Sequence, residues 1–204
     1  MKGKKTIIQF ALATLIGMPL IAVLIDRYSE TVDLAASLIG KAPFWQQLVA
    51  GLVVGIVSAV IAQWIVTRPF MRKINSEYAS LIGNFKMNWS EILFLSMCAG
   101  IGEEILFRGA IQPYMGIFLT SFIFVAIHGY MNPRNWRLSV YGLYMLMVIC
   151  VLGYLSVTMG LITAIIGHTI IDVYLLYRLQ KTAELILPGE EQATDQTTEE
   201  EYDE

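Results

Sequence analysis

Residues 98–109 read Cys-Ala-Gly-Ile-Gly-Glu-Glu-Ile-Leu-Phe-Arg-Gly, so three ionisable side chains, Glu103, Glu104 and Arg108, interrupt an apolar run. An ionisable residue costs roughly 2.5–3.5 kcal/mol at the centre of a membrane helix and therefore usually faces a protein interior or a polar cavity. The 204-residue chain is 56% hydrophobic and 15% charged, with a mean hydropathy of +0.59. A soluble domain carries about 25% charged residues. The composition therefore excludes an ordinary soluble globule and a disordered chain, and it favours a membrane protein.

Apolar segments along the chain predict how often it crosses the membrane. A spanning helix needs about 20 predominantly apolar residues. The sequence offers six candidates, of which the fourth is short: 6–25, 45–67, 89–112, 116–129, 138–159 and 161–179. We therefore expect an all-α fold, a polytopic membrane helix bundle with about six transmembrane helices.

Basic residues in the connecting segments predict the orientation of this bundle. Cytoplasmic loops of membrane proteins carry an excess of Lys and Arg. With six crossings, one side of the membrane receives only Arg27 and Lys41. The other side receives Lys2, Lys4, Lys5, Arg68, Arg72, Lys73, Lys86, Arg134, Arg137, Arg178 and Lys181. This distribution predicts an integral, multi-pass protein of the plasma (inner) membrane with both termini in the cytoplasm.

The chain divides into three expected parts. Residues 1–88 form an N-terminal two-helix membrane region, residues 89–182 a catalytic four-helix membrane core, and residues 183–204 a disordered acidic tail. The tail prediction rests on residues 190–204, which hold eight of the seventeen acidic residues and no basic one. The sequence contains no basic stripe with interleaved aromatic residues, so a nucleic-acid partner is not expected.

The two histidines of the chain also lie at or within apolar segments. His128 ends the run Phe124-Val-Ala-Ile-His128, and His168 begins the run His168-Thr-Ile-Ile-Asp172. Residues four apart on a helix project from one face, so His168 pairs with Asp172 as Glu104 pairs with Arg108. Polar groups on three membrane helices are too costly to face lipid. We expect one interior site formed by Glu103, Glu104, Arg108, His128, His168 and Asp172.

Smaller features of these segments have structural interpretations. Gly100, Gly102 and Gly109 leave little side-chain bulk around the acidic pair, so a neighbouring helix or a substrate backbone can approach closely there. Gln63 and Asn88 are interpreted as structural polar residues.

The residue types of the expected site favour hydrolysis by an activated water molecule. Glu103 has no basic residue at helical spacing and suits a general base acting on water, with His128 sharing or orienting the proton. His168 and Asp172 would face a developing oxyanion from the opposite side. The sequence indicates no Ser or Cys nucleophile. Because Glu, His and Asp are also zinc ligands, a zinc site formed by Glu103, His128, His168 and Asp172 is a second expectation.

The three runs around these residues resemble the ordered motifs of the CAAX protease and bacteriocin-processing family of intramembrane proteases. The family motifs are Glu-Glu-x-x-x-Arg, Phe-x-x-x-His, and His-x-x-x-Asn or Asp, and the resemblance extends over residues 89–179. It implies an endopeptidase that cleaves membrane-associated peptide or protein substrates in or near the bilayer. Glu103 would activate water with help from His128, and His168 and Asp172 would stabilise the oxyanion. Glu104 and Arg108 would support the site or engage the substrate.

Two questions stay open at this level. Members of the family are described both as metalloproteases and as metal-free glutamate proteases, and the resemblance implies no choice between them. Asp172 stands where Asn is frequent, and a carboxylate donates a hydrogen bond only when protonated, so Asp172 would instead orient His168 or hold a metal. The alternatives to a peptidase are a non-catalytic membrane scaffold or immunity protein with the same fold, and a proton-coupled transporter.

Overall fold

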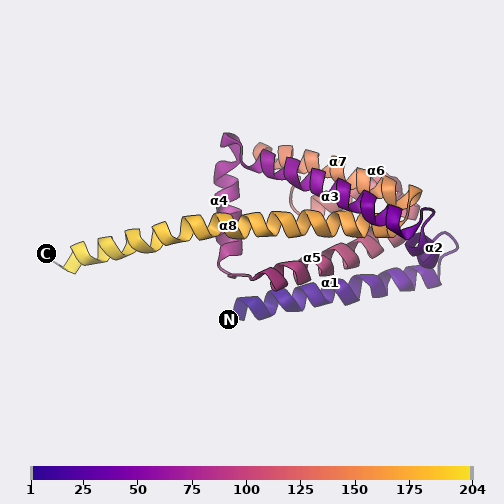
Figure 1. The fold of residues 1–204 in the computed structure, drawn as a ribbon, viewed down its shortest axis with the longest axis horizontal. Helices are drawn as coiled ribbons and strands as arrows, with labels where there is room; N and C mark the ends of the chain where they lie inside the picture. Colours follow the sequence, from indigo (N-terminus) through magenta and orange to yellow (C-terminus); the bar gives the residue numbers. More distant parts are fainter. Residues whose placement is uncertain (1, 203–204) are drawn as a thin grey trace.

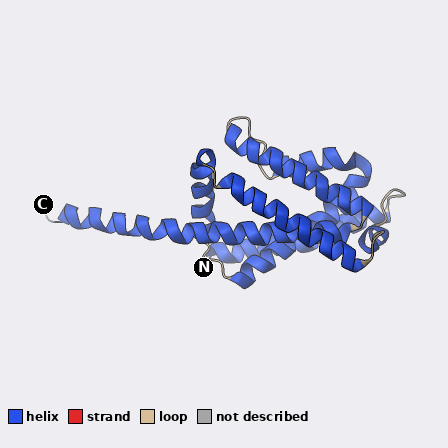
Figure 2. Cartoon of the chain, turned by 45° about the horizontal axis from the view of Figure 1, so that its top comes forward, coloured by secondary structure: helices blue, strands red, loops and turns tan. Residues whose placement is uncertain are grey.

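The computed structural model describes the backbone of residues 2–202 and the side chains of residues 3–186. Within this range the chain forms helices and connecting loops but no strand (Figure 2), which confirms the all-α prediction. The helical elements are α1 (Lys2–Arg27), α2 (Leu34–Ile39), α3 (Phe44–Val66), η1 (Pro69–Met71), α4 (Arg72–Gly83), α5 (Trp89–Glu104), η2 (Ile105–Ile111), α6 (Gln112–Ile127), α7 (Trp136–Thr158) and α8 (Leu161–Tyr202).

Helix length confirms a polytopic bundle but corrects the number of full crossings. Among the described residues, five helical runs are long and apolar enough to span a membrane, where the sequence predicts about six. The third predicted segment, 89–112, and the fourth, 116–129, belong to a single run. These five runs are Gly3–Arg27, Phe44–Val66, Trp89–Ile127, Trp136–Thr158 and Leu161–Ile186.

The run Trp89–Ile127 turns back on itself at Gly116. The backbone of Gly116 has φ 73° and ψ 170°, a conformation that L side chains rarely adopt. After this break, residues 117–127 rise only about 16 Å at 1.5 Å per residue. The hydrocarbon core of a bilayer is about 30 Å thick. The predicted fourth crossing is therefore a half-length return, and it ends at His128 close to the acidic residues of α5.

The chain still completes the predicted number of passes between the two ends of the bundle. Residues 128–135 lead from the end of α6 to Trp136, whose ring stacks on Phe70 of η1, just before α4, with centroids 6.0 Å apart. The start of α1 and the end of α8 lie at the same end of the molecule (Figure 1). This arrangement agrees with the prediction that both termini lie on one side of the membrane.

Small residues allow the central helix α8 to pack closely against its neighbours. An added side-chain Cβ at Gly51 or Gly55 of α3 would lie 2.7 or 2.8 Å from a backbone oxygen of α8. A Cβ at Gly100 of α5 would lie 2.2 Å from the Thr169 hydroxyl, and a Cβ at Gly102 would lie 2.4 Å from the Thr14 carbonyl oxygen of α1. The close approach predicted at Gly100 and Gly102 is thus confirmed, and helix backbones are the neighbours.

The disorder expected for the acidic end of the chain stays a prediction. The segment expected as a disordered tail, 183–204, continues α8 as a helix as far as Tyr202 and projects away from the bundle (Figure 1). Its last two residues lie outside the described chain.

Candidate active site

Helix α5 carries the acidic pair into the middle of the bundle. The helix begins at a capping box, in which the Asn88 side chain accepts from the Glu91 N–H while the Glu91 carboxylate accepts from the Asn88 N–H. Lys4 of α1 also donates to Glu91, at 2.9 and 3.0 Å. The structural interpretation of Asn88 is therefore confirmed. From this anchored start, the apolar residues of α5 lead to Glu103 and Glu104 at its last two positions.

A π-helical turn, η2, follows the acidic pair directly and was not predicted. Pro113 has no backbone N–H and its ring disturbs the carbonyl four residues earlier, so a regular α-helix cannot pass unchanged through residues 109–113. The wider turn over Ile105–Ile111 absorbs this mismatch. Pro113 was the available sequence signal. The turn carries Arg108, which is consistent with the frequent occurrence of π-turns at functional sites.

Glu104 joins Arg108 to His168 in a buried network. The Glu104 side chain is fully buried, and its Oε1 lies 2.8 Å from His168 Nδ1. Because a carboxylate accepts, His168 Nδ1 donates, which turns His168 Nε2 towards Glu103 and Asp172. Arg108 Nε lies 3.1 Å from Glu104 Oε2, so the predicted pair is formed. The network fixes the orientation of the His168 ring.

Glu103 lies between the two imidazole rings. Its Oε2 is 3.5 Å from His128 Nε2 and 4.0 Å from His168 Nε2, and His168 Nε2 is 3.6 Å from Asp172 Oδ2. These separations are longer than direct hydrogen bonds and suit contacts bridged by a small molecule. The Glu103 Oε2 atom is buried and has no hydrogen-bond partner among the described residues. His128 Nδ1 donates to the Phe124 carbonyl oxygen at 2.7 Å, so the Nε2 atom is the one that faces Glu103.

One cavity of about 280 Å³ brings four of the predicted residues together. Glu103, His128, His168 and Asp172 all line it, whereas Glu104 and Arg108 do not. Glu104 lies behind His168, and Arg108 lines a different pocket. The six predicted residues are therefore close in space but divide into a cavity-facing set and a supporting pair.

Phe124 holds the parts of this site together, a contribution that the sequence did not reveal beyond its place in the Phe-x-x-x-His run. Its ring stacks on His128 with centroids 4.4 Å apart and meets the edge of His168 at 5.7 Å. The Arg108 guanidinium carbon lies 4.6 Å from the centroid of the same ring. Phe107 packs against it edge-on at 5.0 Å. One aromatic side chain thus contacts both histidines and the supporting arginine.

Further cavity residues come from segments outside the motifs. Tyr130 follows the second motif, and burial together with the Asp172 carboxylate raises the pKa of its phenol, so it stays a neutral hydroxyl. Gln63 of α3 was interpreted as structural, but it lines the cavity, as do Asn75 and Tyr78 of α4. Sequence spacing could not identify these residues, because α3 and α4 join the site only through the fold.

The zinc site expected from the sequence stays a prediction. Within residues 3–186, no group of three or more His, Cys, Asp or Glu side chains is arranged to hold a metal ion. Zinc ligands lie about 2.0–2.2 Å from the ion and belong to a compact set. Side-chain atoms of Glu103, His128, His168 and Asp172 lie 3.5–4.0 Å apart, only a little more than the roughly 3.3–3.6 Å between neighbouring ligand atoms of a tetrahedral zinc ion. We derive no step through a metal.

Comparison with known proteins supports the assignment of this region. Residues 85–174 match the family model described as type II CAAX prenyl endopeptidase, Rce1-like. The uncharacterized protein YpbD of Bacillus subtilis (strain 168) is 34% identical over 55 residues, which are 27% of this chain and 29% of that protein. The match therefore covers less than a third of the length of that relative. No solved structure matches the chain significantly. The matched residues carry the whole predicted site, and over residues 85–174 the chain is similar to the Rce1-like type II CAAX prenyl endopeptidases.

Proposed function

We propose that this chain is an intramembrane endopeptidase that hydrolyses membrane-associated peptide or protein substrates with a water molecule activated by Glu103. The observation that carries the proposal is the position of Glu103 Oε2, a buried carboxylate oxygen with no described hydrogen-bond partner, between His128 and His168 in one cavity. A carboxylate in this position is suited to accept a proton from water. The family match over residues 85–174 supports a peptidase.

The proton transfer follows from the orientation of Glu103 and His128. Glu103 accepts one proton from water while the water oxygen forms a bond to the carbonyl carbon of the scissile peptide. His128 Nε2, 3.5 Å from Glu103 Oε2, orients the water and passes the proton to the departing amine nitrogen. The carbon–nitrogen bond then breaks, and the products are a carboxylic acid and an amine. His128 is suited to this exchange because Nδ1 is already occupied by the Phe124 carbonyl.

The opposite wall of the cavity supplies stabilisation for the oxyanion. When both ring nitrogens of His168 carry protons, Nδ1–H donates to Glu104 and Nε2–H points into the cavity. The Nε2–H group can then donate to the oxygen of the tetrahedral intermediate. Asp172, 3.6 Å from the same nitrogen, orients the ring and balances its charge. Glu104 and Arg108 act as positioning residues because they hold His168 without lining the cavity.

The cavity walls favour a substrate segment with apolar side chains. Apart from the polar groups at its base, the cavity is lined by apolar residues of α7 and α8, among them Leu138, Met145, Ile149, Leu175 and Leu179. Residues of α4 line it as well, at the end of the bundle where the described termini lie (Figure 1). We therefore propose that the scissile segment enters beside α4.

The decisive experiment compares peptide cleavage by the full-length protein and by Glu103→Gln in detergent. The substitution keeps the shape of the side chain but removes its ability to accept a proton. We expect at least a hundredfold loss of kcat, since a positioned general base contributes about 10²–10⁴-fold. Glu77→Gln, an exposed carboxylate on α4 with a 4.0 Å contact to Lys73, is the matched control and should leave the rate unchanged.

Two results would contradict the proposal. Equal cleavage by Glu103→Gln and the unmodified protein would remove Glu103 from the chemistry. A folded protein that cleaves nothing in a broad library of membrane-associated peptides would favour the non-catalytic scaffold instead. Folding is checked independently by thermal melting of each variant in detergent.

A further inference from the structure

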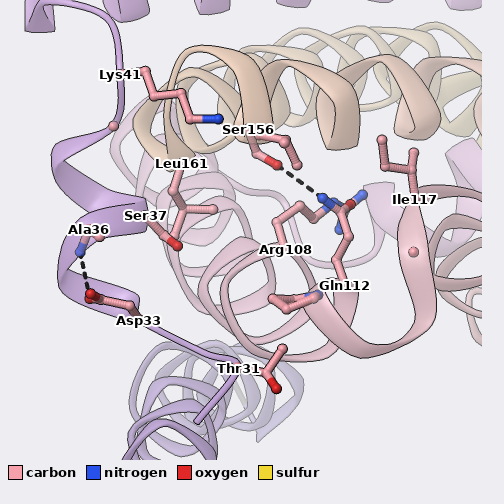
Figure 3. Close-up of a pocket in the computed structure, with 14 residues that line it drawn as sticks. Thr31, Asp33, Ala36, Ser37, Lys41, Arg108, Gln112, Ile117, Ser156 and Leu161 are labelled. Atoms are coloured by element: carbon pink, nitrogen blue, oxygen red, sulfur yellow. Dashed lines mark hydrogen bonds between the residues drawn. The ribbon is translucent and has the colours of Figure 1, made fainter. Parts of the chain in front are cut away.

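An apolar groove lies on the outside of the bundle between α3 and α7. It has a volume of about 810 Å³, and its walls come from α3, η1 and α7, with one residue of α6. It shares no lining residue with the peptidase cavity. Figure 3 shows a different pocket, at the end of the bundle away from the described termini, where lining side chains such as Gln112 and Ser156 bond to each other at 3.3 Å. The groove is separate from both.

Exposed apolar side chains place this groove against lipid. Leu143 and Met147 of α7 are 65% and 58% exposed, and Phe118 of α6 is 68% exposed. All three belong to helical runs that are long and apolar enough to span a membrane. A surface of this kind within the bilayer is suited to an apolar chain along its length.

The length of the groove corresponds to one leaflet of a bilayer. Its lining residues on α7 run from Val140 to Cys150, over which a helix rises about 15 Å. The hydrocarbon core is about 30 Å thick, so one leaflet contributes about 15 Å. Arg68 and Phe70 also line the groove, and they follow α3 at the end of the bundle where the described termini lie (Figure 1). That end is cytoplasmic by the positive-inside rule, so the groove follows the cytoplasmic leaflet.

Arg68 places a positive charge at the headgroup end of the groove. Its guanidinium carbon lies 4.3 Å from the centroid of the Trp64 ring, which also lines the groove, and its Nε donates to the Trp64 carbonyl oxygen at 3.1 Å. The side chain is half-buried rather than enclosed, and no acidic side chain is among the lining residues. Because the held contact uses Nε, the terminal nitrogens are left to recognise a phosphate group.

Aromatic and basic residues next to Arg68 agree with a headgroup at this end. The ring of Trp136 stacks on Phe70, and the exposed Arg137 has its guanidinium carbon 5.8 Å from the Trp136 centroid. Tryptophan is enriched at the interface between membrane and water. Basic pockets between transmembrane helices on the cytoplasmic side bind anionic headgroups. The charge and the apolar wall thus lie in the order of a phospholipid's own parts.

We propose that this groove binds an anionic phospholipid of the cytoplasmic leaflet, with its phosphate at Arg68 and one acyl chain along α7. A second copy of the chain or a substrate segment could cover the apolar wall, but neither accounts for a cation at one end of a groove that is one leaflet long. The inference is independent of the proposed hydrolysis, because it concerns binding on the opposite side of the α3–α7 contact from the peptidase cavity.

The first test measures lipid binding to the purified full-length protein in detergent by native mass spectrometry. Phosphatidylglycerol is compared with phosphatidylcholine of the same acyl chains, which has no net charge. A basic residue near the membrane surface contributes about 1 kcal/mol, or about fivefold, to the attraction of anionic lipid. Arg68→Gln should therefore weaken phosphatidylglycerol binding about fivefold and remove its preference over phosphatidylcholine. Arg178→Gln is the matched control, because Arg178 is an exposed arginine of α8 outside the groove.

The second test fills the apolar part of the groove and leaves Arg68 in place. Leu143→Trp adds bulk along α7, and it should weaken the binding of both lipids at least tenfold. Val53→Trp is the control, because Val53 of α3 is 55% exposed but lies outside the groove, and its variant should bind as the unmodified protein does. Thermal melting in detergent checks that each variant is folded.

Each contrary outcome overturns a stated part of the proposal. Equal phosphatidylglycerol binding by Arg68→Gln and Arg178→Gln would exclude Arg68 as the phosphate site. Equal lipid binding by Leu143→Trp and Val53→Trp would exclude the groove. A lipid-free dimer that only Leu143→Trp dissociates would assign the groove to a second copy of the chain. Loss of peptide cleavage in Leu143→Trp, with lipid binding unchanged, would assign it to the substrate.

Discussion

Glu104 contacts a cation and an imidazole but has no access to the cavity. Replacing it with Gln would leave Arg108 fully buried without a counter-charge, and breaking a buried pair in this way costs about 3–5 kcal/mol. We expect Glu104→Gln to lower the melting temperature strongly in detergent. Glu91→Gln is the control, because Glu91 of α5 also pairs with a cation, Lys4 of α1, but is partly exposed, and its loss should cost below about 1 kcal/mol. Equal decreases in melting temperature for the two variants would show that burial does not determine how much each ion pair stabilises the protein.

A second prediction at the residue scale concerns the hydrogen bonding of Asp172. Its Oδ2 lies 3.6 Å from His168 Nε2, and the family resemblance accepts Asn or Asp at this position. Asn keeps the size of the side chain and can both donate and accept. We expect Asp172→Asn to retain kcat/KM within about tenfold, whereas Asp172→Leu, which removes all hydrogen bonding, loses at least a hundredfold. Peptide cleavage by the two variants measures this difference, and equal losses would mean that the negative charge itself is required.

At the scale of the element, sequence patterns predict which side chains share a helix face better than they predict the course of the backbone. The spacing of Glu104 with Arg108 and of His168 with Asp172 correctly predicts pairs on one helix face, because that spacing is a local property of helices. The π-turn over Ile105–Ile111 and the reversal at Gly116 were not predicted. The reversal depends on how α6 packs in the bundle, so a hydropathy count treats the half-length return as another crossing.

The contact between α1 and α5 provides the prediction for this scale. An added Cβ at Gly102 would lie 2.4 Å from the Thr14 carbonyl oxygen, which is backbone and cannot rotate away. We expect Gly102→Ala to push α1 from α5 and to lower stability by about 1–3 kcal/mol through overpacking. Gly17→Ala on α1 is the control, because no atom lies within 4 Å of its added Cβ and alanine favours a helix. Thermal melting in detergent compares them, and an unchanged Gly102→Ala would mean that α1 is not tightly packed there.

At the scale of the whole molecule, the site combines the motif residues with residues of the earlier helices α3 and α4. The motif residues of α5, α6 and α8 supply the polar groups, and these were predictable because ionisable residues stand out in apolar segments. The walls of the cavity also include Gln63 of α3 and Tyr78 of α4, which lie outside the residues that the family model matches. Long-range packing decides which apolar or neutral residue joins a cavity, and no local pattern in the sequence encodes it.

The orientation of the bundle leads to the last prediction. Helix α4, which contains Lys73, lies at the end of the bundle with the described termini, whereas the connection from α1 to α2, which contains Glu30, lies at the opposite end (Figure 1). Both residues are exposed, so a cysteine introduced at either position should react readily once Cys98 and Cys150 are replaced by Ala. Because the lysine-rich and arginine-rich segments share the end that carries Lys73, the positive-inside rule places that end in the cytoplasm. A membrane-impermeant maleimide should therefore label Lys73→Cys in inverted vesicles only and Glu30→Cys in right-side-out vesicles only. Labelling of both positions from the same side would contradict the placement of Lys73 and Glu30 at opposite ends of the bundle. Labelling of Lys73→Cys only in right-side-out vesicles and of Glu30→Cys only in inverted vesicles would show the opposite orientation in the membrane.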